Sequence, residues 1–429
     1  MSGMTSPSFS THPSAAHAGI LPPYLLRRLS RASDPDVAMP ARETLRIERS
    51  MRVRREMRSA RRPGGTPGRP GPAGGGAGII PQTLRRRVEP QARRELARPD
   101  RAARPEPADT RPAAPKRNVY DAEHGRELPG VLRRAEGDGP HADESVNEAY
   151  DGLGAAWTFL HDAYGRDSLD GAGLALVASV HFGRNYDNAF WDGEQMVFGD
   201  GDGKVFRSFT DSLDVIAHEL AHGFTQYTRG FVYVGQPGAL NEHISDVLGV
   251  LTVQYDLGQS VDQADWLVGA GLFTDQVQGV ALRSLKAPGT AYDDPILGKD
   301  PQPAHMRDYA TMPHDEEHDN GGVHINSGIP NHAFYLAAMA LGGRAWERAG
   351  QVWYDVMTSS RLPKDVEFSE FAAATVEAAR QRFGDDTRPA TAIADAWRRV
   401  GVEPAGDARV PERRHPWVPG TEAAARGPR

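Results

Sequence analysis

Two histidines and a glutamate stand at a spacing that suits metal chemistry. Residues 214–224 read DVIAHELAHGF and contain His218, Glu219 and His222. On an α-helix, His218 and His222 lie on one face one turn apart, so a single metal ion can reach both imidazoles. Glu219 is rotated from them by about 100° and can stand beside the metal without ligating it. The pattern predicts a zinc-binding helix with a carboxylate base.

A catalytic zinc ion needs a third protein ligand and one open position. The chain has no cysteine, so that ligand must be a histidine or a carboxylate. Glu242 follows His218 by 24 residues, which is enough for a loop and a return helix. Asp246 comes one turn later, where it could accept the Nδ1–H of a ligating histidine. The alternative is a solvated helix face, but the neighbouring residues are apolar, and buried carboxylates need partners.

A third group of polar residues comes later in the chain. Residues 319–328 read DNGGVHINSG and join an acidic loop to a helix. A histidine held by an upstream aspartate can donate a proton or stabilise an oxyanion. Asp319 and His324 are candidates for this pair, although a histidine in a loop usually has no such role.

These motifs together resemble those of the thermolysin family of zinc metallopeptidases. The resemblance covers residues 118–402 and is close in four blocks, which span 185–191, 214–233, 238–249 and 319–331. The first of these blocks reads NYDNAFW. The front of the chain, with Pro-Pro-Tyr-Leu-Leu at 22–26, is similar to the precursor region of the protealysin-like branch.

The resemblance implies a role for each matching residue. The metal ligands would be His218, His222 and Glu242, with Glu219 as general base and Asp246 orienting the first ligand. Tyr233 and His324 would be oxyanion-side donors, with Asp319 as partner of His324. Asn188 and the backbone of Ala189 would hold the substrate main chain, and Arg283 would contact the residue after the scissile bond. The walls of an apolar specificity pocket would be Phe206, Val215 and Leu282.

The resemblance implies a neutral endopeptidase with one catalytic Zn²⁺ that cleaves on the amino side of bulky hydrophobic residues. A zinc-activated water would attack the peptide bond, with Glu219 as its base. The family's paired calcium site is expected to be absent. Asp214 and Asp265 match acidic positions of that site, but Val253, Leu267 and Ala270 replace others, and two carboxylates cannot balance two Ca²⁺ ions. A single Ca²⁺ elsewhere, for instance at residues 293–294, stays open.

Charge divides the chain into two parts. Residues 1–117 carry about 24 Lys and Arg against about 10 Asp and Glu, whereas the remainder carries about 26 against about 47. A basic segment in front of an acidic body predicts a prosegment that covers the catalytic cleft and is then removed. Residues 63–78 are rich in glycine and proline and predict a cleavable tether.

The order of patterns predicts an α+β fold, with a β-rich half followed by an α-helical half and the zinc-binding helix at the cleft between them. We expect a largely disordered basic prosegment at 1–62 and a processing linker at 63–117. The catalytic halves would span 118–212 and 213–402, with a tail at 403–429. Helices are expected at 145–164, 213–229, 238–256, 326–342, 343–360, 367–384 and 389–400.

Other functions were weighed against a peptidase. A catalytically inactive zinc-binding interaction protein of the same fold is one alternative, but the residues at the positions of base and oxyanion donors have the active types. The basic segment could be a nucleic-acid arm, yet it has few aromatic residues for base stacking. We expect protein or peptide substrates, the chain's own prosegment as a partner, no membrane partner and a monomer.

The remaining histidines receive no catalytic role from the sequence. Those read as structural or solvated are His181, His243, His305, His314, His318 and His332. The start of the chain lacks the apolar run of a secretory signal peptide. The sequence therefore predicts a protein that stays in the cytoplasm or leaves the cell by a route that needs no such signal.

Overall fold

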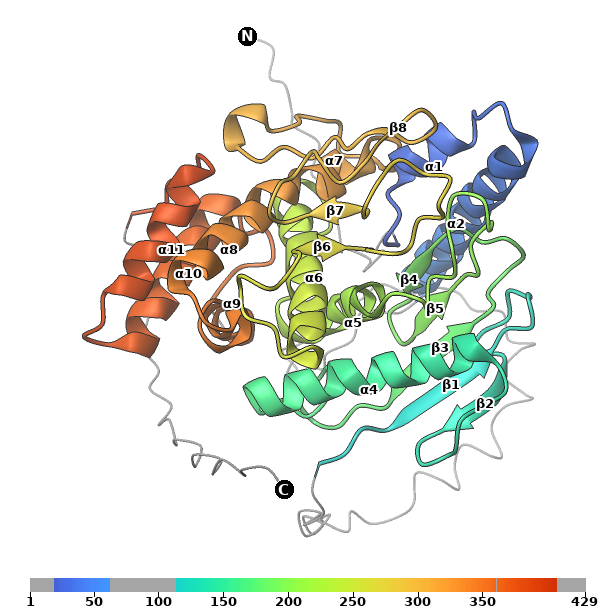
Figure 1. Cartoon of the computed structure of the whole chain (residues 1–429), viewed down its shortest axis with the longest axis horizontal. Coiled ribbons are helices and arrows are strands. Elements are labelled where there is room, and N and C mark those ends of the chain that lie inside the picture. The colour runs from blue at the N-terminus through green and yellow to red at the C-terminus, as the bar shows by residue number, and fades with distance from the viewer. Residues whose placement is uncertain (1–18, 62–112, 360, 407–429) are drawn as a thin grey trace, which may run out of the picture. The chain divides into compact units, whose positions relative to one another are not determined.

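The computed structural model describes residues 19–61, 113–359 and 361–406. In the catalytic body a β-containing half precedes an α-helical half (Figure 1). This order confirms the predicted α+β class. Most of the predicted linker, and the tail beyond residue 406, lie outside the described residues. Within the described residues, no helix is long and apolar enough to cross a lipid bilayer.

Five strands form the main sheet of the first half. They are β1 (Arg117–Asp121), β2 (Val131–Ala135), β3 (Leu176–Val180), β4 (Ala189–Trp191) and β5 (Met196–Phe198). Their order in the sheet is β2-β1-β3-β5-β4. The three central strands β1, β3 and β5 run parallel, and the two outer strands are antiparallel to their neighbours. The three parallel strands therefore end at the same edge of the sheet.

Helix α4 (Glu144–Tyr164) packs against β1 and β3. The carboxylate of Asp143 accepts hydrogen bonds from the backbone N–H groups of Ser145 and Val146, which satisfies donors that a helix start leaves free. The helix ends at Gly165, whose φ of 64° is a left-handed conformation that glycine adopts at little cost. The predicted helix over 145–164 is confirmed to within one residue.

The second half is built from helices. They are α5 (Leu213–Thr228), α6 (Gly235–Asp256), α7 (Asp319–Asn326), α8 (Gly328–Leu341), α9 (Ala349–Thr358), α10 (Phe368–Phe383) and α11 (Arg388–Arg399). Two small antiparallel sheets separate α6 from α7. These sheets are β6 (Leu267–Val268) with β7 (Arg283–Ser284), and β8 (Asp293–Asp294) with β9 (Gly298–Lys299). Short 3₁₀ turns occupy η2 (Met306–Asp308), η3 (Glu316–His318) and η4 (Ala345–Glu347).

One helix differs from the sequence prediction. The pattern predicts a helix over 326–342, whereas the structure has α8 and, before it, α7. Asn320, Gly321 and Gly322 lie inside α7 with φ of 50°, 88° and 76°. Because glycine weakens a helical pattern, the sequence indicates a loop here. In the structure these residues form a left-handed turn. This turn is followed directly by the helical turn that contains His324.

The basic front segment forms two helices, α1 (Pro23–Leu29) and α2 (Pro35–Arg61). Leu25, Leu26 and Leu29 are buried, as their helical spacing predicts, and they belong to the main hydrophobic core. Further along, Ile47 packs with Phe182 and other apolar side chains of the first half. Residues 20–47 of this segment therefore contribute to the same hydrophobic cores as the body.

Helices α5 and α6 pack closely enough to need a glycine at their crossing. A Cβ atom added to Gly249 of α6 would lie 2.8 Å from the backbone carbonyl oxygen of Asp214 in α5. Carbon atoms do not approach a carbonyl oxygen so closely, and backbone cannot rotate away as a side chain can. The distance between the two helices is therefore set by the missing side chain.

We predict that Gly249→Ala separates α5 from α6 and lowers the free energy of unfolding by about 1–3 kcal/mol. Gly139→Ala is the matched control, because an added Cβ there meets nothing within 4 Å. Thermal unfolding of both variants tests the idea. Equal midpoints for the two variants would show that the crossing tolerates a side chain.

Candidate functional site

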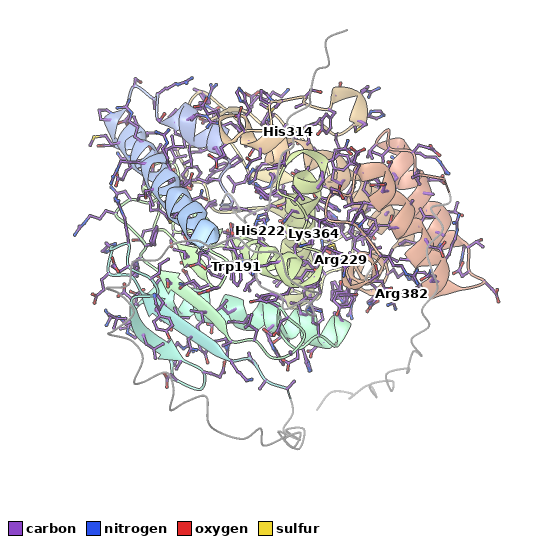
Figure 2. The ribbon with its side chains drawn as sticks, turned by 180° about the vertical axis from the view of Figure 1, so that it is seen from behind. Trp191, His222, Arg229, His314, Lys364 and Arg382 are labelled. Carbon is purple, nitrogen blue, oxygen red and sulfur yellow. The ribbon has the colours of Figure 1, made fainter. Side chains whose placement is uncertain are left out.

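Helix α5 presents two buried imidazoles to the interior. His218 and His222 are fully buried, and their ring centroids lie 4.8 Å apart. Figure 2 labels His222 and Trp191 near the centre of the molecule, where α5 packs against β4. The indole Nε1–H of Trp191 donates to Gln226 at 3.0 Å, which ties this strand to the helix. The helix is therefore held in place from both sides, by β4 and by α6.

Glu242 reaches the two histidines from α6. Its Oε2 lies 3.5 Å from Nε2 of His218, and its Oε1 lies 3.7 Å from Nε2 of His222. These gaps are too long for good hydrogen bonds. Zinc held at about 2.0–2.1 Å by tetrahedral ligands keeps the ligand atoms about 3.3–3.4 Å apart. The three side chains therefore leave a space that fits one zinc ion.

The other ring nitrogens have partners that fix the orientation of both rings. Nδ1 of His218 lies 2.9 Å from Oδ1 of Asp246, and Nδ1 of His222 lies 2.9 Å from Oδ1 of Asn241. With Nδ1 engaged, each Nε2 is turned toward Glu242. Hydrogen bonds of this kind orient metal-binding histidines and select the tautomer that can ligate.

Asp246 is itself held by two buried side chains. The guanidinium of Arg283 donates to both carboxylate oxygens at 2.8–3.2 Å, and Nδ2 of Asn331 donates to Oδ2 at 2.8 Å. Burial would raise the pKa of Asp246, but the charge of Arg283 and the contact with His218 outweigh it and keep the pKa below its usual range. The group beside His218 is therefore a carboxylate.

Glu242 is also ionised in its buried position. Burial would raise its pKa, but His324, His222 and His218 outweigh burial and hold the pKa well below its usual range. As zinc ligands the two imidazoles would be neutral, and together with one carboxylate they would form a donor set that suits this ion.

Glu219 is fully buried beside the three metal-site residues. Burial raises the pKa of its carboxyl to about 8. A carboxyl group with a pKa close to neutrality can accept and release a proton near pH 7. The position and the chemistry of Glu219 both suit a general base, which is the role that the sequence predicts.

A chain of polar contacts leads from Glu242 toward α7. The hydroxyl of Tyr233 donates to Oε1 of Glu242 and lies 3.5 Å from Nε2 of His324. Nδ1 of His324 lies 2.7 Å from Oδ1 of Asp319, which also accepts the backbone N–H of His324 through Oδ2 at 2.9 Å. Burial would lower the pKa of His324, but the Glu242 and Asp319 carboxylates outweigh it and raise the pKa. Tyr233, His324 and Asp319 are thus brought to the metal side of the site.

The predicted substrate-binding residues contact the front segment of the chain. The backbone N–H of Ile20 donates to the carbonyl of Ala189 at 3.0 Å. Asn188 accepts from Leu21 N–H at 2.9 Å and donates to the Leu21 carbonyl at 3.2 Å. The carbonyl of Ile20 accepts from Nη1 of Arg283 at 3.1 Å. Residues 20–21 are therefore held by the backbone of Ala189 and by the side chains of Asn188 and Arg283.

The three predicted pocket residues are all buried in the main core. Phe206 bridges to Phe273 through a short β-contact, and the side chain of Leu282 lies against Gly269. Val215 lies on α5 just before the first metal-site histidine. Their assignment as walls of one specificity pocket stays a prediction.

The acidic residues near the expected calcium positions have protein partners. Oδ2 of Asp214 accepts the backbone N–H of Gly269 at 2.5 Å, and burial raises the pKa of Asp214 to about 6. Asp265 accepts from the backbone of Leu267 at 3.1 Å. The absence of a paired calcium site stays a prediction.

Sequence reasoning missed several residues that support the site. Asn241 and Asn331 give no local signal in the sequence. Asn241 contacts His222, 19 positions away, and Asn331 contacts Asp246, 85 positions away. Arg283 was predicted to contact substrate, but its ion pair with Asp246 was not foreseen. The pairing of a buried arginine and aspartate 37 positions apart becomes visible only in the folded chain.

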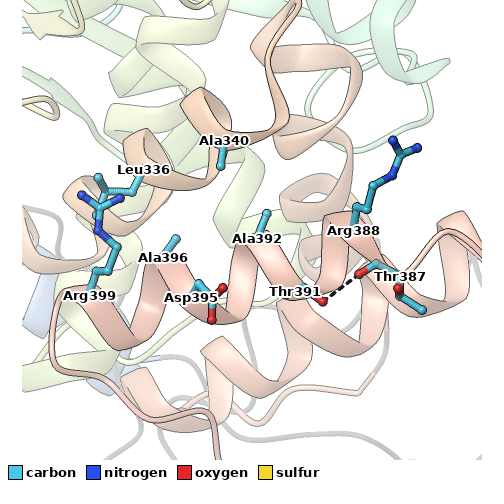
Figure 3. Close-up of a pocket in the computed structure, with 9 residues that line it drawn as sticks. All are labelled: Leu336, Ala340, Thr387, Arg388, Thr391, Ala392, Asp395, Ala396 and Arg399. Carbon is cyan, nitrogen blue, oxygen red and sulfur yellow. Dashed lines mark hydrogen bonds between the residues drawn. The ribbon is translucent and has the colours of Figure 1, made fainter.

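A separate open groove lies between α8 and α11 (Figure 3). It has a volume of about 520 Å³. Leu336 and Ala340 form one side, and Ala392 and Ala396 face them from α11. The groove shares no residue with the metal site and takes no part in its chemistry.

Comparisons with known proteins agree with this geometry. Family models described as the thermolysin metallopeptidase catalytic domain and its alpha-helical domain match residues 111–226 and 229–402. The chain is 52% identical over 301 residues to an extracellular metalloprotease of Pectobacterium carotovorum subsp. carotovorum, covering 70% of this chain and 85% of that protein. It is 35% identical over 294 residues to a thermolysin of Alicyclobacillus acidocaldarius subsp. acidocaldarius, covering 66% and 50%.

A solved structure is also similar. The precursor of protealysin, a metalloproteinase from Serratia proteamaculans, matches with a TM-score of 0.72 and 43% sequence identity. The match covers 90% of this chain and 100% of that one, so it includes a precursor segment.

The predicted location is contradicted by these comparisons. A cytoplasmic protein, or one exported without a signal peptide, was expected from the composition of the first residues. Relatives from Pectobacterium and from Serratia marcescens are instead named as extracellular metalloproteases, which points to secretion. The expectation was wrong because the absence of one apolar run does not determine where a protein acts.

We predict that Asp246→Asn weakens zinc binding by about 10–100-fold, as the loss of a carboxylate partner of a ligating histidine does. Competition with a coloured zinc chelator measures the affinity. Asp265→Asn is the control, because it makes the same chemical change at an exposed position outside the site. An unchanged affinity in Asp246→Asn would mean that His218 is oriented by other contacts.

Proposed function

This chain belongs to the thermolysin family of metallopeptidases and is a metalloendopeptidase, and we propose that it is made as a precursor. We propose that it hydrolyses peptide bonds on the amino side of bulky hydrophobic residues, with Glu219 as the general base. The observation that carries this proposal is the convergence of His218, His222 and Glu242 at zinc-ligand spacing with Glu219 buried beside them. We further propose that the mature enzyme acts outside the cell, as its relatives' names suggest.

In the proposed reaction the side chains have separate tasks. His218, His222 and Glu242 would hold zinc, which when bound polarises the scissile carbonyl and makes an attacking water more acidic. Glu219 accepts the proton of that water and passes it to the leaving amine. Burial raises the pKa of Glu219, which favours the first transfer, because a more basic carboxylate takes the proton of the water more readily.

Two further groups stabilise the charge that develops on the carbonyl oxygen. We assign the hydroxyl of Tyr233 and Nε2 of His324 as hydrogen-bond donors to this oxygen. Asp319 supports the assignment, because its contact with Nδ1 keeps the imidazole turned so that Nε2 faces the site. A donor held rigidly by buried partners needs little reorganisation during the reaction.

The front segment acts, in this proposal, as a built-in inhibitor. Ile20 and Leu21 engage Asn188, Ala189 and Arg283, the groups assigned to hold the substrate backbone. A Cβ at Gly19 would lie 2.1 Å from the carbonyl oxygen of Ala189, so the chain approaches the body very closely there. Substrate cannot occupy these groups until the segment leaves.

Polar contacts along α1 and α2 add to this docking. The guanidinium of Arg28 donates to the carbonyl of Ile296 at 2.8 Å, and Arg27 donates to backbone carbonyls of η3. The backbone N–H of Asp187 donates to Oγ1 of the buried Thr44 at 2.9 Å. We propose that about residues 1–117 are removed by self-cleavage, which breaks these contacts and opens the site.

We predict that Glu219→Gln keeps zinc but lowers turnover by roughly 10²–10⁴-fold, because the proton acceptor is lost. The variant should also remain a 46.6 kDa chain while the wild type becomes shorter. Metal analysis, a peptide assay and gel electrophoresis measure the three properties. His324→Ala serves for comparison and should keep residual activity, having lost one oxyanion donor. Wild-type turnover in Glu219→Gln would exclude it as the base.

We predict that a peptide library is cleaved before Leu, Phe or Ile. Phe206, Val215 and Leu282 support this expectation, because all three are apolar and buried. Sequencing of the cleavage products gives the preference directly. A profile dominated by charged residues on the carboxyl side of the cut would contradict the assigned pocket.

We predict that Thr44→Val speeds conversion of the precursor. Valine has nearly the same shape but leaves the Asp187 N–H without its acceptor, at a cost of about 1–3 kcal/mol to docking. Arg46→Ala is the control, because Arg46 makes only an exposed ion pair with Glu43, and such pairs contribute little. The time course of conversion is the measurement. Equal rates in Thr44→Val and wild type would mean that docking does not limit processing.

A further inference from the structure

A second cluster of metal-ligating side chains lies in the β-containing half, at the edge where the parallel strands end. His124 follows the end of β1 by three residues, His181 directly follows β3, and Asp200 follows β5 by two. The three strands are neighbours in the sheet (Figure 1). Side chains that follow adjacent parallel strands converge at one edge, where ligands of open sheets usually bind.

The side chains of this cluster are within reach of one ion. Nδ1 of His181 lies 2.7 Å from Oδ1 of Asp200, and Nδ1 of His124 lies 3.2 Å from Oδ2 of the same carboxylate. One donor atom from each of the three residues can be chosen so that all lie within 4.8 Å of one another. Small rotations of the side chains would make room for an ion between them.

The remaining nitrogen of His181 is already oriented. Its Nε2 lies 2.8 Å from Oδ2 of Asp143, the residue that caps α4 through Oδ1. A carboxylate on one imidazole nitrogen and a metal on the other is the usual arrangement around a ligating histidine. Asp246 contacts one ring nitrogen of His218 in the same way.

The backbone holds both histidines in an uncommon conformation. His124 has φ of 56° and His181 has φ of 54°, in the left-handed region that residues with side chains seldom occupy. The N–H of His124 donates to the carbonyl of His181 at 2.9 Å, which joins the two turns. Such conformations persist where the surrounding structure enforces them, and they gather at functional sites.

We propose that His124, His181 and Asp200 form a second binding site for a divalent transition-metal ion of the zinc type, with Asp143 positioning His181. Two imidazoles and one carboxylate suit zinc, whereas calcium prefers an all-oxygen shell. The side chains of His124 and Asp200 are 48% and 30% exposed, so water can complete the coordination. An ion here would join the ends of β1, β3 and β5 to the start of α4, and would stabilise the first half of the catalytic body.

The sequence assigned His181 no more than a structural role, and the competing account is an ion pair between its imidazolium and two aspartates. That account leaves His124 without a necessary function and predicts no metal. The two accounts differ in metal stoichiometry, which can be measured independently of peptidase activity.

The test is calorimetric titration of the full chain with Zn²⁺, in a Glu219→Gln background that prevents self-digestion and with the catalytic site already loaded. We expect one further equivalent to bind. His124→Asn should weaken it at least tenfold, because asparagine tolerates the left-handed backbone but offers no imidazole. Asp143→Asn should weaken it about 10–100-fold, and it retains an oxygen that caps α4.

His161→Asn is the matched control. His161 also contacts an aspartate, Asp162, at 2.8 Å, but on the surface of α4 and outside the cluster. It should bind the second equivalent like the parent chain. Added Zn²⁺ should also raise the unfolding temperature of the parent but not of His124→Asn. A single equivalent in the parent, or a second equivalent unaffected by both cluster variants, would overturn the proposal.

Discussion

The close contact between α5 and α6 is the constraint on which the site depends. Gly249 permits the approach, and the approach brings Glu242 to within 3.5–3.7 Å of Nε2 of His218 and His222. A buried carboxylate between two imidazoles needs a positive charge to offset its lost hydration. A zinc ion would supply that charge, and helix packing and metal binding would then stabilise each other. Asp246, Arg283 and Asn331 then keep the first ligand in the orientation that the ion requires.

The same residues explain how the precursor can be folded and inactive at once. Arg283 is shared between Asp246, which belongs to the metal site, and the carbonyl of Ile20, which belongs to the front segment. Asn188 pairs with Leu21 through both its oxygen and its nitrogen. Docking therefore occupies the groups that we assign to the substrate backbone and leaves the three proposed zinc ligands in place. Removal of the segment would expose a site that is already assembled.

Local sequence signals predicted the parts of this structure that depend on spacing along one element. The helix around His218 and His222, the helix that carries Glu242 and the helical spacing of Leu25, Leu26 and Leu29 all follow from periodicity. The glycines at 321 and 322 indicated a loop, because glycine has a low helix propensity. The structure instead places them in a left-handed turn inside α7.

Contacts between distant parts of the chain were not predictable in the same way. Two examples are the ion pair of Asp246 with Arg283 and the hydrogen bonds of residues 20–21 to residues 188–189. Both depend on how whole elements dock. Likewise, His181 received only a structural or solvated role from the sequence, and its partners Asp143, Asp200 and His124 come from three separate turns. Charge asymmetry predicted that the basic segment covers the acidic body, but not which atoms meet.

Anomalous X-ray diffraction at the zinc absorption edge, on crystals of the full chain, tests the central claim most directly. The account predicts a strong peak between Nε2 of His218, Nε2 of His222 and the carboxylate of Glu242, at about 2.0–2.2 Å from each ligand atom. Crystals grown with zinc that show no peak among these three side chains would contradict it.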